Sequence, residues 1–325
     1  MKSYEKKYRL IINYYIYFNN NKKEIIKIIF LLLVYLNYVI LKNKFKKKNI
    51  NIKICICTVG KNENRYIKEY VEYYKNYGID KIFLYDNNNI DGEKFEEIIN
   101  EYVIQNFVEI INWRGIQSPQ MMIYNDCYNN NYNKYDWLIF NDIDEYIYLK
   151  NYNNIKIFLN KPRFNKCEKI QLNWVLFTDN NYISYENKSL LEKFIEIDPY
   201  VKIRKIDKNS NGKSILRGHI PNIKIVNFHS ISDELKSCDS FGHIVNNIKR
   251  DYKYYYFKHY YCKSTEEFIE KLKKGDVYQG NIPVKIATYF NYNKITYQKI
   301  NLIEKNVGVN LTYYKNIIAI SKKKN

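Results

Sequence analysis

The sequence predicts an α/β fold in which a mostly parallel sheet is covered by helices, and two observations support this class. Between residues 50 and 140, four short apolar segments alternate with three segments of helical hydrophobic spacing, the pattern of parallel strands joined by crossover helices. The 325 residues are 46% hydrophobic and 17% aromatic, which excludes a disordered chain. With 10 Gly and 5 Pro, the sequence also falls outside the collagen-like and low-complexity classes.

Each element follows from an apolar run and from the polar or glycine residues that bound it. The strands expected in the first half are 50–59, 81–85, 108–113 and 137–140. The helices between them are expected at 62–77, capped by Asn62, and at 91–102 and 118–130. Beyond residue 144 the pattern is less regular, with strands expected at 167–177 and 223–228 and a helix at 265–274.

The first 50 residues are predicted to be a basic tail that carries a candidate membrane anchor. Residues 1–53 contain 13 Lys and Arg against 2 Asp and Glu. The anchor would be the apolar segment 25–41, although its charge-free run, 28–41, is shorter than the ~20 residues of a comfortable span. An interfacial helix and a buried soluble helix are the alternatives. We expect a membrane-associated protein, single-pass or peripheral, with the side of the membrane left open.

The formal net charge of +19 does not indicate nucleic-acid binding, because more than half of the excess lies in this tail. The sequence has no Arg-rich stripe, zinc-finger spacing or RNA-binding aromatic motif, so we expect no nucleic-acid partner.

The six cysteines show no C-x-x-C motif and no paired spacing typical of a metal site. We expect them to be small buried apolar residues without a disulfide framework, with Cys55 and Cys57 on one face of the first strand.

Three carboxylates, Asp142, Asp144 and Glu145, follow the fourth expected strand. In an extended segment Asp142 and Asp144 point to the same side, and their repulsion favours a bound cation. Oxygen ligands select Mg²⁺ or Mn²⁺, and such an ion can hold a diphosphate. A solvated acidic turn is the alternative. Because ligands of parallel sheets bind at the carboxyl ends of the strands, the context favours a metal–nucleotide site.

Several segments within residues 54–275 carry a family resemblance in series. They read CTVGKNENRYIKEYVEYYKNY from residue 57, then INWRG, QMMIYNDC, YDWLIFNDIDEYI, NWVLF, KSILR and HYYCKSTEEFIEKLKKG. Together they resemble glycosyltransferase family 92 and the GT-A type, glycosyltransferase 2-like class. The resemblance implies a GT-A domain, expected at 51–300 and followed by a tail at 301–325. It also implies metal-dependent, inverting transfer of a sugar from a nucleotide sugar to a glycan or lipid-linked acceptor, with a UDP-sugar such as UDP-galactose as donor.

The same resemblance assigns roles to individual residues. Donor binding is carried over to Thr58, Lys61, Asn62, Glu63, Asp86, Asn87, Arg114, Gln120 and Trp174. Asp142 and Asp144 match the metal motif, and GT-A enzymes often complete this site with a C-terminal histidine, which makes His229 or His259 a candidate ligand. We favour His229 because it follows the strand expected at 223–228.

The general base is left open among five carboxylates, Glu145, Asp179, Asp233, Glu234 and Asp239. Two other functions compete with sugar transfer. A metal-dependent nucleotidyl- or phosphotransferase would use the same carboxylates, but no Walker-type glycine-rich loop supports it. A catalytically inactive, membrane-tethered binding protein is the third possibility, and the intact Asp142–Asp144 pair argues against it.

Overall fold

The structure is a computed structural model that describes residues 29, 31–33, 35–36, 51–198, 212–227, 229, 231–232, 234–246, 251, 253–274 and 282–323. The chain divides into two units, Met1–Asn51 and Ile52–Asn325. Most of the candidate anchor lies outside the described residues, and those of its residues that are described, between Ile29 and Leu36, are helical. Within the described part of the chain, no helix has the length and apolar character needed to cross a bilayer.

The strands of the second unit form one mixed sheet. In the part of the chain that the structure describes, nine strands pair in the order β3-β2-β1-β4-β7-β6-β9-β5, with β8 beside β6. The strands are β1 Ile54–Gly60, β2 Lys81–Asp86, β3 Val108–Asn112, β4 Trp137–Phe140, β5 Glu145–Leu149, β6 Lys169–Leu176, β7 Gly212–Arg217, β8 Ser237–Cys238 and β9 Tyr255–His259. The four predicted N-terminal strands are confirmed, and β1 pairs in parallel with both β2 and β4.

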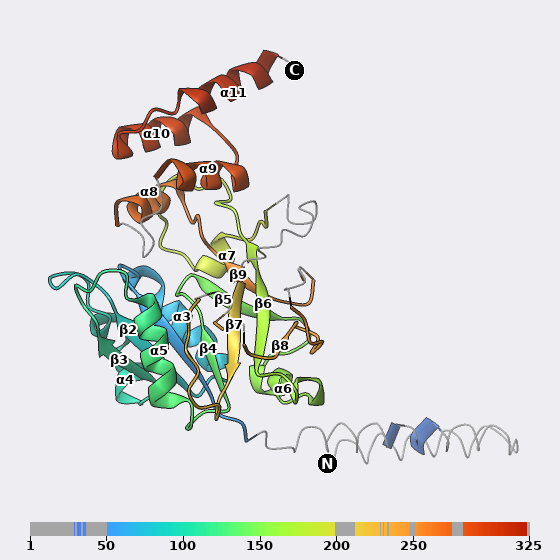
Figure 1. Ribbon diagram of the computed structural model, residues 1–325. Helices are drawn as coiled ribbons and strands as arrows, with labels where there is room; N and C mark the ends of the chain where they lie inside the picture. The colour runs from blue at the N-terminus through green and yellow to red at the C-terminus, as the bar shows by residue number, and fades with distance from the viewer. Residues whose placement is uncertain are drawn as a thin grey trace, which may run out of the picture. The chain divides into compact units, whose positions relative to one another are not determined.

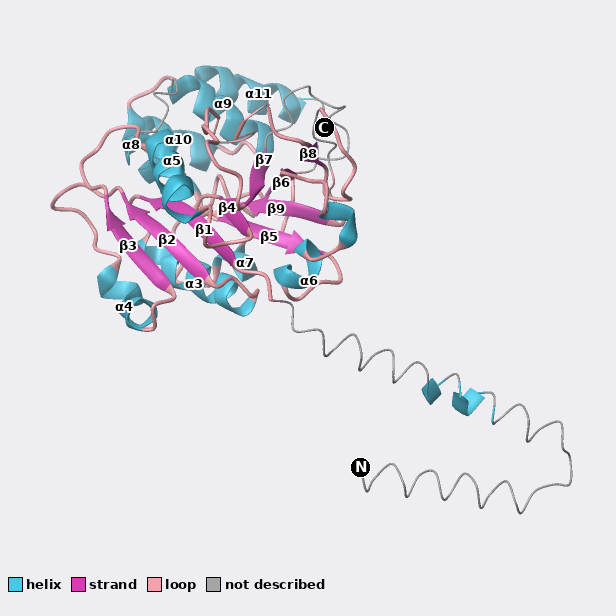
Figure 2. Ribbon diagram, turned by 60° about the horizontal axis from the view of Figure 1, so that its bottom comes forward, coloured by secondary structure: helices cyan, strands magenta, loops and turns pink. Residues whose placement is uncertain are grey.

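Helices cover the two faces of this parallel half. They are α3 Asn64–Asn76, α4 Glu96–Ile104 and α5 Gln120–Asn131. In β1, Ile54 and Ile56 face the core formed with α3 and α4, whereas Cys55 and Cys57 face the core formed with α5. Figure 2 shows α5 on one side of the sheet and α3 and α4 on the other. Because both of their faces are buried, β1, β2 and β4 are mostly apolar, as parallel strands are, whereas the edge strand β3 carries the exposed residues Glu109 and Asn112.

The second half of the sheet differs from the predicted parallel arrangement. β7 runs antiparallel to both β4 and β6, and β5 runs antiparallel to β9. The strand expected at 223–228 is wrong, because Ile223–Val226 is irregular and Asn227 forms only an isolated bridge with Ile231. Short helices connect this half: α6 Ile155–Leu159, η1 Pro162–Phe164 and α7 Leu190–Lys193.

Four further helices pack into a separate apolar cluster at one end of the unit (Figure 1). They are α8 Thr265–Lys274, α9 Ile282–Tyr292, α10 Tyr297–Val307 and α11 Thr312–Lys323. The helix predicted at 265–274 is confirmed. The prediction of a C-terminal tail at 301–325 is wrong for the described residues 301–323, because they include most of α10 and all of α11. Ile300, Ile303 and Leu311 are buried there against Phe268 and Phe290.

The expectation that the cysteines form no disulfide is wrong. Cys57 in β1 is bonded to Cys127 in α5, and Cys167 before β6 is bonded to Cys238 in β8. The pairs lie 70 and 71 residues apart in sequence, so spacing gave no signal and only the tertiary fold brings them together. Cys55 and Cys262 are buried free thiols, as expected.

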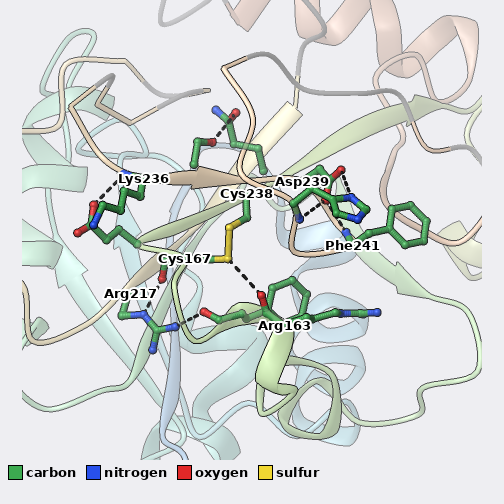
Figure 3. Close-up of a disulfide and its surroundings, with 12 residues drawn as sticks. Arg163, Cys167, Arg217, Lys236, Cys238, Asp239 and Phe241 are labelled. Atoms are coloured by element: carbon green, nitrogen blue, oxygen red, sulfur yellow. Dashed lines mark hydrogen bonds and ion pairs between the residues drawn. A yellow bond between two sulfur atoms is a disulfide. The ribbon is translucent and has the colours of Figure 1, made fainter.

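The second disulfide lies beside a hydrogen-bonded arginine that joins three segments (Figure 3). Arg217, at the end of β7, donates hydrogen bonds to the carbonyls of Cys167 (2.6 Å) and Phe164 (2.5 Å). Its guanidinium also lies 4.2 Å from the centre of the Trp137 ring in β4. Arg217 thus connects β7 with β4 and with the residues before β6. The disulfide between Cys167 and Cys238 adds a covalent bond from these residues to β8.

We expect an alkylation experiment on the unfolded, unreduced protein to label two of the six cysteines, Cys55 and Cys262. Reduction should label all six and lower the free energy of unfolding by about 2–4 kcal/mol for each disulfide lost. Mass spectrometry counts the labels, and urea unfolding measures the stability. Six labels before reduction would contradict both bonds.

Candidate functional site

The carboxyl ends of the parallel strands border a cleft of about 620 Å³. This is the edge at which the parallel-sheet rule places ligands. The cleft is lined by nine of the residues predicted from the sequence, namely Lys61, Glu63, Asn87, Gln120, Asp142, Asp144, Trp174, His229 and His259. Residues from β1, β2, β4, β6 and β9 and from the loops that follow them thus meet at one site, although they span 199 positions of sequence between Lys61 and His259.

The turn after β4 is held by a buried asparagine, so its carboxylates have fixed directions. Asn141 accepts a hydrogen bond from the Tyr70 hydroxyl (3.0 Å) and donates one to the Glu145 carbonyl (2.9 Å). Ile143 points into the core, 2.7 Å from where a Cβ on Gly60 would lie. Asp142 and Asp144 both line the cleft, but they belong to a turn in which the Glu145 amide donates to the Asp142 carbonyl (3.0 Å), and not to the extended segment that was expected.

Asp142 is held by a buried lysine and a glutamine. Its carboxylate lies 3.0 Å from Lys213 Nζ and accepts a hydrogen bond of 2.9 Å from Gln120 Nε2. Lys213 comes from β7, is fully buried, and also lies 3.9 Å from Glu145 Oε1. Burial lowers the pKa of Lys213, but Asp142 and Glu145 outweigh that effect and hold it well above its usual range. Gln120 therefore lines the cleft and also orients the Asp142 carboxylate.

Asp144 is paired with a lysine from the C-terminal helices. Its carboxylate lies 3.2 Å from Lys271 Nζ in α8 and 3.7 Å from His259 Nε2 in β9. Burial raises the pKa of Asp144, but Lys271, His259 and Lys263 together outweigh it, so this pKa lies well below its usual range. Asp144 is consequently an ionised carboxylate at any physiological pH.

Glu145 and His259 complete a group that can hold a metal ion. Ligand atoms of Asp144, Glu145 and His259 lie within 4.8 Å of one another. Glu145 Oε1 and His259 Nδ1 are buried and have no hydrogen-bond partner among the described residues. Burial raises the pKa of Glu145 well above its usual range. Buried carboxylate and imidazole atoms without a hydrogen bond suit a divalent cation, so these residues fit the predicted ion, with Glu145 in the group in place of the predicted Asp142.

Both candidate histidines lie beside the predicted tryptophan. The ring of Trp174 is 4.8 Å from that of His229 and 4.4 Å from that of His259, measured between centres. Burial lowers the pKa of each histidine to about 4, so both imidazoles are neutral near pH 7 and able to ligate. His259, not the favoured His229, belongs to the group that includes Asp144. His229 instead lies within 3.0 Å of the Gly212 carbonyl through Nδ1.

Four predicted donor-binding residues do not line this cleft. Thr58 is fully buried inside β1, and Asn62 borders a neighbouring cavity. Arg114 donates to the buried Asp86 carboxylate (2.8 Å) and to the Asn89 carbonyl (3.1 Å). The Asp86–Arg114 pair therefore fixes the loop after β2. Arg114 was predicted to bind phosphate or sugar oxygens, but its donors serve this loop.

The predicted bases also lie elsewhere, and a different carboxylate occupies the cleft. Asp179 is buried against Lys299 (2.6 Å), Asp239 is buried against His243 (3.1 Å), and Glu234 is exposed outside the cleft. Asp233 lies outside the described residues, and Glu145 is buried behind Asp142. Of the described cleft residues, Glu63 is the one carboxylate besides the two aspartates.

Glu63 is surrounded by lysines that the sequence analysis did not single out. Lys263 lies 2.9 Å and Lys274 lies 3.3 Å from its carboxylate. Burial raises the pKa of Glu63, but these two lysines outweigh it and lower the pKa below the usual value. Lys271, Lys274 and Lys285 line the cleft, and Lys213 lies behind it. The available signal was the position of Lys213 in the family-like segment KSILR and of Lys271 and Lys274 in EKLKKG, whereas Lys285 lies in neither segment.

Comparison with known proteins decides the family. The model of glycosyltransferase family 92 matches residues 50–310, which is most of the chain. The chain belongs to glycosyltransferase family 92. The residues that it matches include every described residue of the cleft, from Val59 to Lys285.

Relatives that share part of the sequence carry the same family name. A family 92 protein of Ricinus communis is 31% identical over 98 residues, 30% of this chain and 16% of the relative. A family 92 protein of Arabidopsis thaliana is 28% identical over 33% of this chain and 18% of its own length. A family 92 protein of Oryza sativa is 28% identical over 29% of this chain and 16% of its own length. The aligned segments thus span less than a fifth of these relatives.

Solved structures give only distant similarity. TarS of S. aureus in complex with UDP has a TM-score of 0.36 and 11% identity over 74% of this chain and 71% of that chain. The complex of TarS with UDP-GlcNAc has a TM-score of 0.33 and 13% identity over 80% and 77% of the two chains.

We expect Lys213→Met to lower the free energy of unfolding by about 3 kcal/mol, because it leaves Asp142 and Glu145 without their buried cation. The matched control is Lys68→Met, which breaks an exposed pair with Glu101 (3.3 Å) and should change stability by less than about 1 kcal/mol. Urea unfolding of the metal-free proteins measures both. Equal stability of the Lys213 variant and the parent would contradict the role of Lys213.

We expect His259 to make the metal-free protein less stable as the pH falls from about 6.5 to about 4. The folded pKa, about 4, is below the ordinary value of 6.5, so in this window the unfolded chain binds the proton more readily. The stability attributable to His259 should then fall by about 1.4 kcal/mol per pH unit. Urea unfolding of the parent and of His259→Gln at pH 7 and pH 5 tests this, and the variant should show the shallower dependence. Identical pH dependence would contradict the shifted pKa.

Proposed function

We propose that this family 92 chain transfers a sugar from a nucleotide sugar to a glycan or lipid-linked acceptor, and that the strand-end cleft is the donor site. The observation that carries the proposal is the convergence of Asp142, Asp144 and His259 with lysines from α8 in one cleft at the carboxyl ends of β1, β2 and β4. Membership of the family supports the reaction class. The order β3-β2-β1-β4 with helices on both faces also agrees with a GT-A arrangement.

We propose Mn²⁺ or Mg²⁺ as the cofactor, held by Asp144, Glu145 and His259, with Asp142 beside them. When bound, such an ion neutralises the charge of the diphosphate leaving group. Lys271 and Lys274 face the same cleft one helical turn apart and supply further positive charge toward phosphate oxygens. Trp174 offers an aromatic surface against which a sugar ring can pack.

The acceptor hydroxyl must lose a proton as it attacks the sugar. We infer that Glu63 receives it, since Glu63 is the remaining carboxylate among the described residues of the cleft. The lowered pKa of Glu63 keeps it ionised near pH 7 and thus able to accept a hydrogen bond from the hydroxyl. A UDP-sugar, with UDP-galactose among the donors to be tested, and inversion at the anomeric carbon are part of the proposal.

Two disulfides bear on where this reaction takes place. Disulfides form and persist in oxidising compartments and are rare in the reducing cytosol. We therefore propose that the domain Ile52–Asn325 works on the oxidising side of a membrane, with the basic N-terminal segment as its attachment.

We expect Asp142→Asn and Asp144→Asn each to reduce Mn²⁺-dependent release of UDP from UDP-sugars at least about a hundredfold, because charge stabilisation of the leaving group is lost. EDTA should bring the parent protein to the same level. The fold should be retained with reduced stability, because Lys213 or Lys271 then loses its carboxylate partner.

Asp126→Asn is the matched control for these two variants. Asp126 lies in α5 outside the cleft and accepts a hydrogen bond from Tyr85 (2.6 Å), so turnover should be unchanged. Circular dichroism verifies folding of all three variants. Undiminished, EDTA-resistant turnover in the Asp142 and Asp144 variants would refute the metal-dependent donor site, and no turnover in any variant or the parent would favour the inactive binding protein.

A further inference from the structure

We propose that a second cavity beside the donor cleft binds a phosphate group on the acceptor, so that the acceptor is a phosphorylated sugar or glycan. This inference rests on the proposed function, because it assigns the partner substrate of the same reaction. The cavity has a volume of about 570 Å³ and lies between the start of α3 and the last turns of α8.

The two cavities share a wall. Lys61, Glu63, Asn89, Tyr261, Lys271 and Lys274 line both of them. A molecule in the second cavity is therefore separated from a donor in the cleft only by these side chains. Glu63, the proposed proton acceptor, lies in this shared wall, which is where the acceptor hydroxyl has to meet the donor.

The charge of the second cavity favours an anion. Of the described residues that line it, six are Lys or Arg and four are Glu. Glu270 is ion-paired with Arg65 (2.7 Å). Glu93 and Glu267 accept hydrogen bonds from the neutral Asn64 amide (3.0 Å) and Ser264 hydroxyl (2.7 Å), so both keep their negative charge.

Apart from the Arg65–Glu270 pair, five lysines line the cavity against three glutamates. Lys263 and Lys274 both converge on Glu63, and Lys271 is paired with Asp144 across the shared wall. Lys61 has no ion-pair partner among the described residues, and Lys273 lies on the same helix as Lys274. Glu63 and Asp144 compensate part of this positive charge, and a bound anion would compensate the rest.

An aromatic ring in the shared wall identifies the rest of the ligand. Tyr261 lines both cavities, and Lys271 Nζ lies 4.2 Å from the centre of its ring. An aromatic face beside charged donors suits a sugar ring that carries a phosphate. We therefore favour a sugar phosphate over a lipid phosphate, whose acyl chains would need an apolar channel, whereas Lys, Arg and Glu dominate the cavity.

The test uses the full chain and titrates inorganic phosphate calorimetrically into protein that is saturated with UDP and Mn²⁺. We expect phosphate to bind without displacing UDP. The double variant Lys263→Gln/Lys273→Gln removes two lysines that line only the second cavity, and it should weaken phosphate binding at least about tenfold, or about 1.4 kcal/mol. The control Lys68→Gln, which loses one exposed ion-paired lysine on α3, should bind phosphate as the parent does.

Two soluble probes separate the sources of the phosphate. Glucose 6-phosphate should bind more tightly than inorganic phosphate, and glucose alone should not bind, if the ligand is a sugar phosphate. Tighter binding of a short-chain phosphatidate than of glucose 6-phosphate would overturn the assignment of a sugar.

The outcomes distinguish this inference from the proposed function. Full competition between phosphate and UDP, or unchanged affinity in the double variant, would overturn the second site while leaving the donor site intact. If UDP itself fails to bind, the proposed donor site fails. The titration without UDP then still decides the second cavity by the difference between the double variant and the Lys68 control.

Discussion

The structure depends on how the chain compensates the carboxylates at the end of β4. The buried strand β4 is followed, within a stretch of four residues, by Asp142, Asp144 and Glu145. The repulsion between these carboxylates would be costly without nearby cations. Lys213 supplies one cation from β7, the antiparallel neighbour of β4. Lys271 supplies another from α8, which is more than a hundred residues further along the chain. The mixed half of the sheet and the C-terminal helices are thus tied electrostatically to the parallel half.

This compensation also sets the chemical character of the cleft. Because the pKa of Asp144 is lowered and those of His229 and His259 are lowered to about 4, the cleft near pH 7 presents an ionised carboxylate beside neutral imidazoles. That combination suits a divalent cation better than a proton. The lysines of α8 then add the positive charge that a diphosphate requires, so one cleft can serve both an ion and its anionic ligand.

The sequence predicted the parallel half of the sheet well because local signals there agree with the tertiary structure. Apolar runs such as 81–85 and 137–140 are strands in the structure, and the parallel-sheet rule correctly placed Lys61, Asn87 and Asp142 at one edge. The rest could not be predicted because it depends on contacts between distant segments. The disulfides join cysteines about 70 residues apart. Lys213 resembles an ordinary solvent-facing residue of a strand until its burial beside Asp142 is known.

Residues that match family motifs turn out to have unequal roles. Arg114 is a residue type that often binds phosphate, but here it donates hydrogen bonds to Asp86 and to loop carbonyls. Glu69, which lies in the family-like segment that begins at residue 57, accepts hydrogen bonds from Ser189 (2.6 Å) and the Leu190 amide (2.8 Å) at the start of α7. Such residues position the loops around the cleft, and a substitution there would act on the shape of the site.

The most direct test of the account is anomalous scattering from crystals grown with Mn²⁺ and UDP. The account predicts one manganese peak among Asp144, Glu145 and His259, with the uridine diphosphate extending along the cleft toward Lys271 and Lys274. A manganese ion at any other position, or UDP bound outside this cleft, would contradict it.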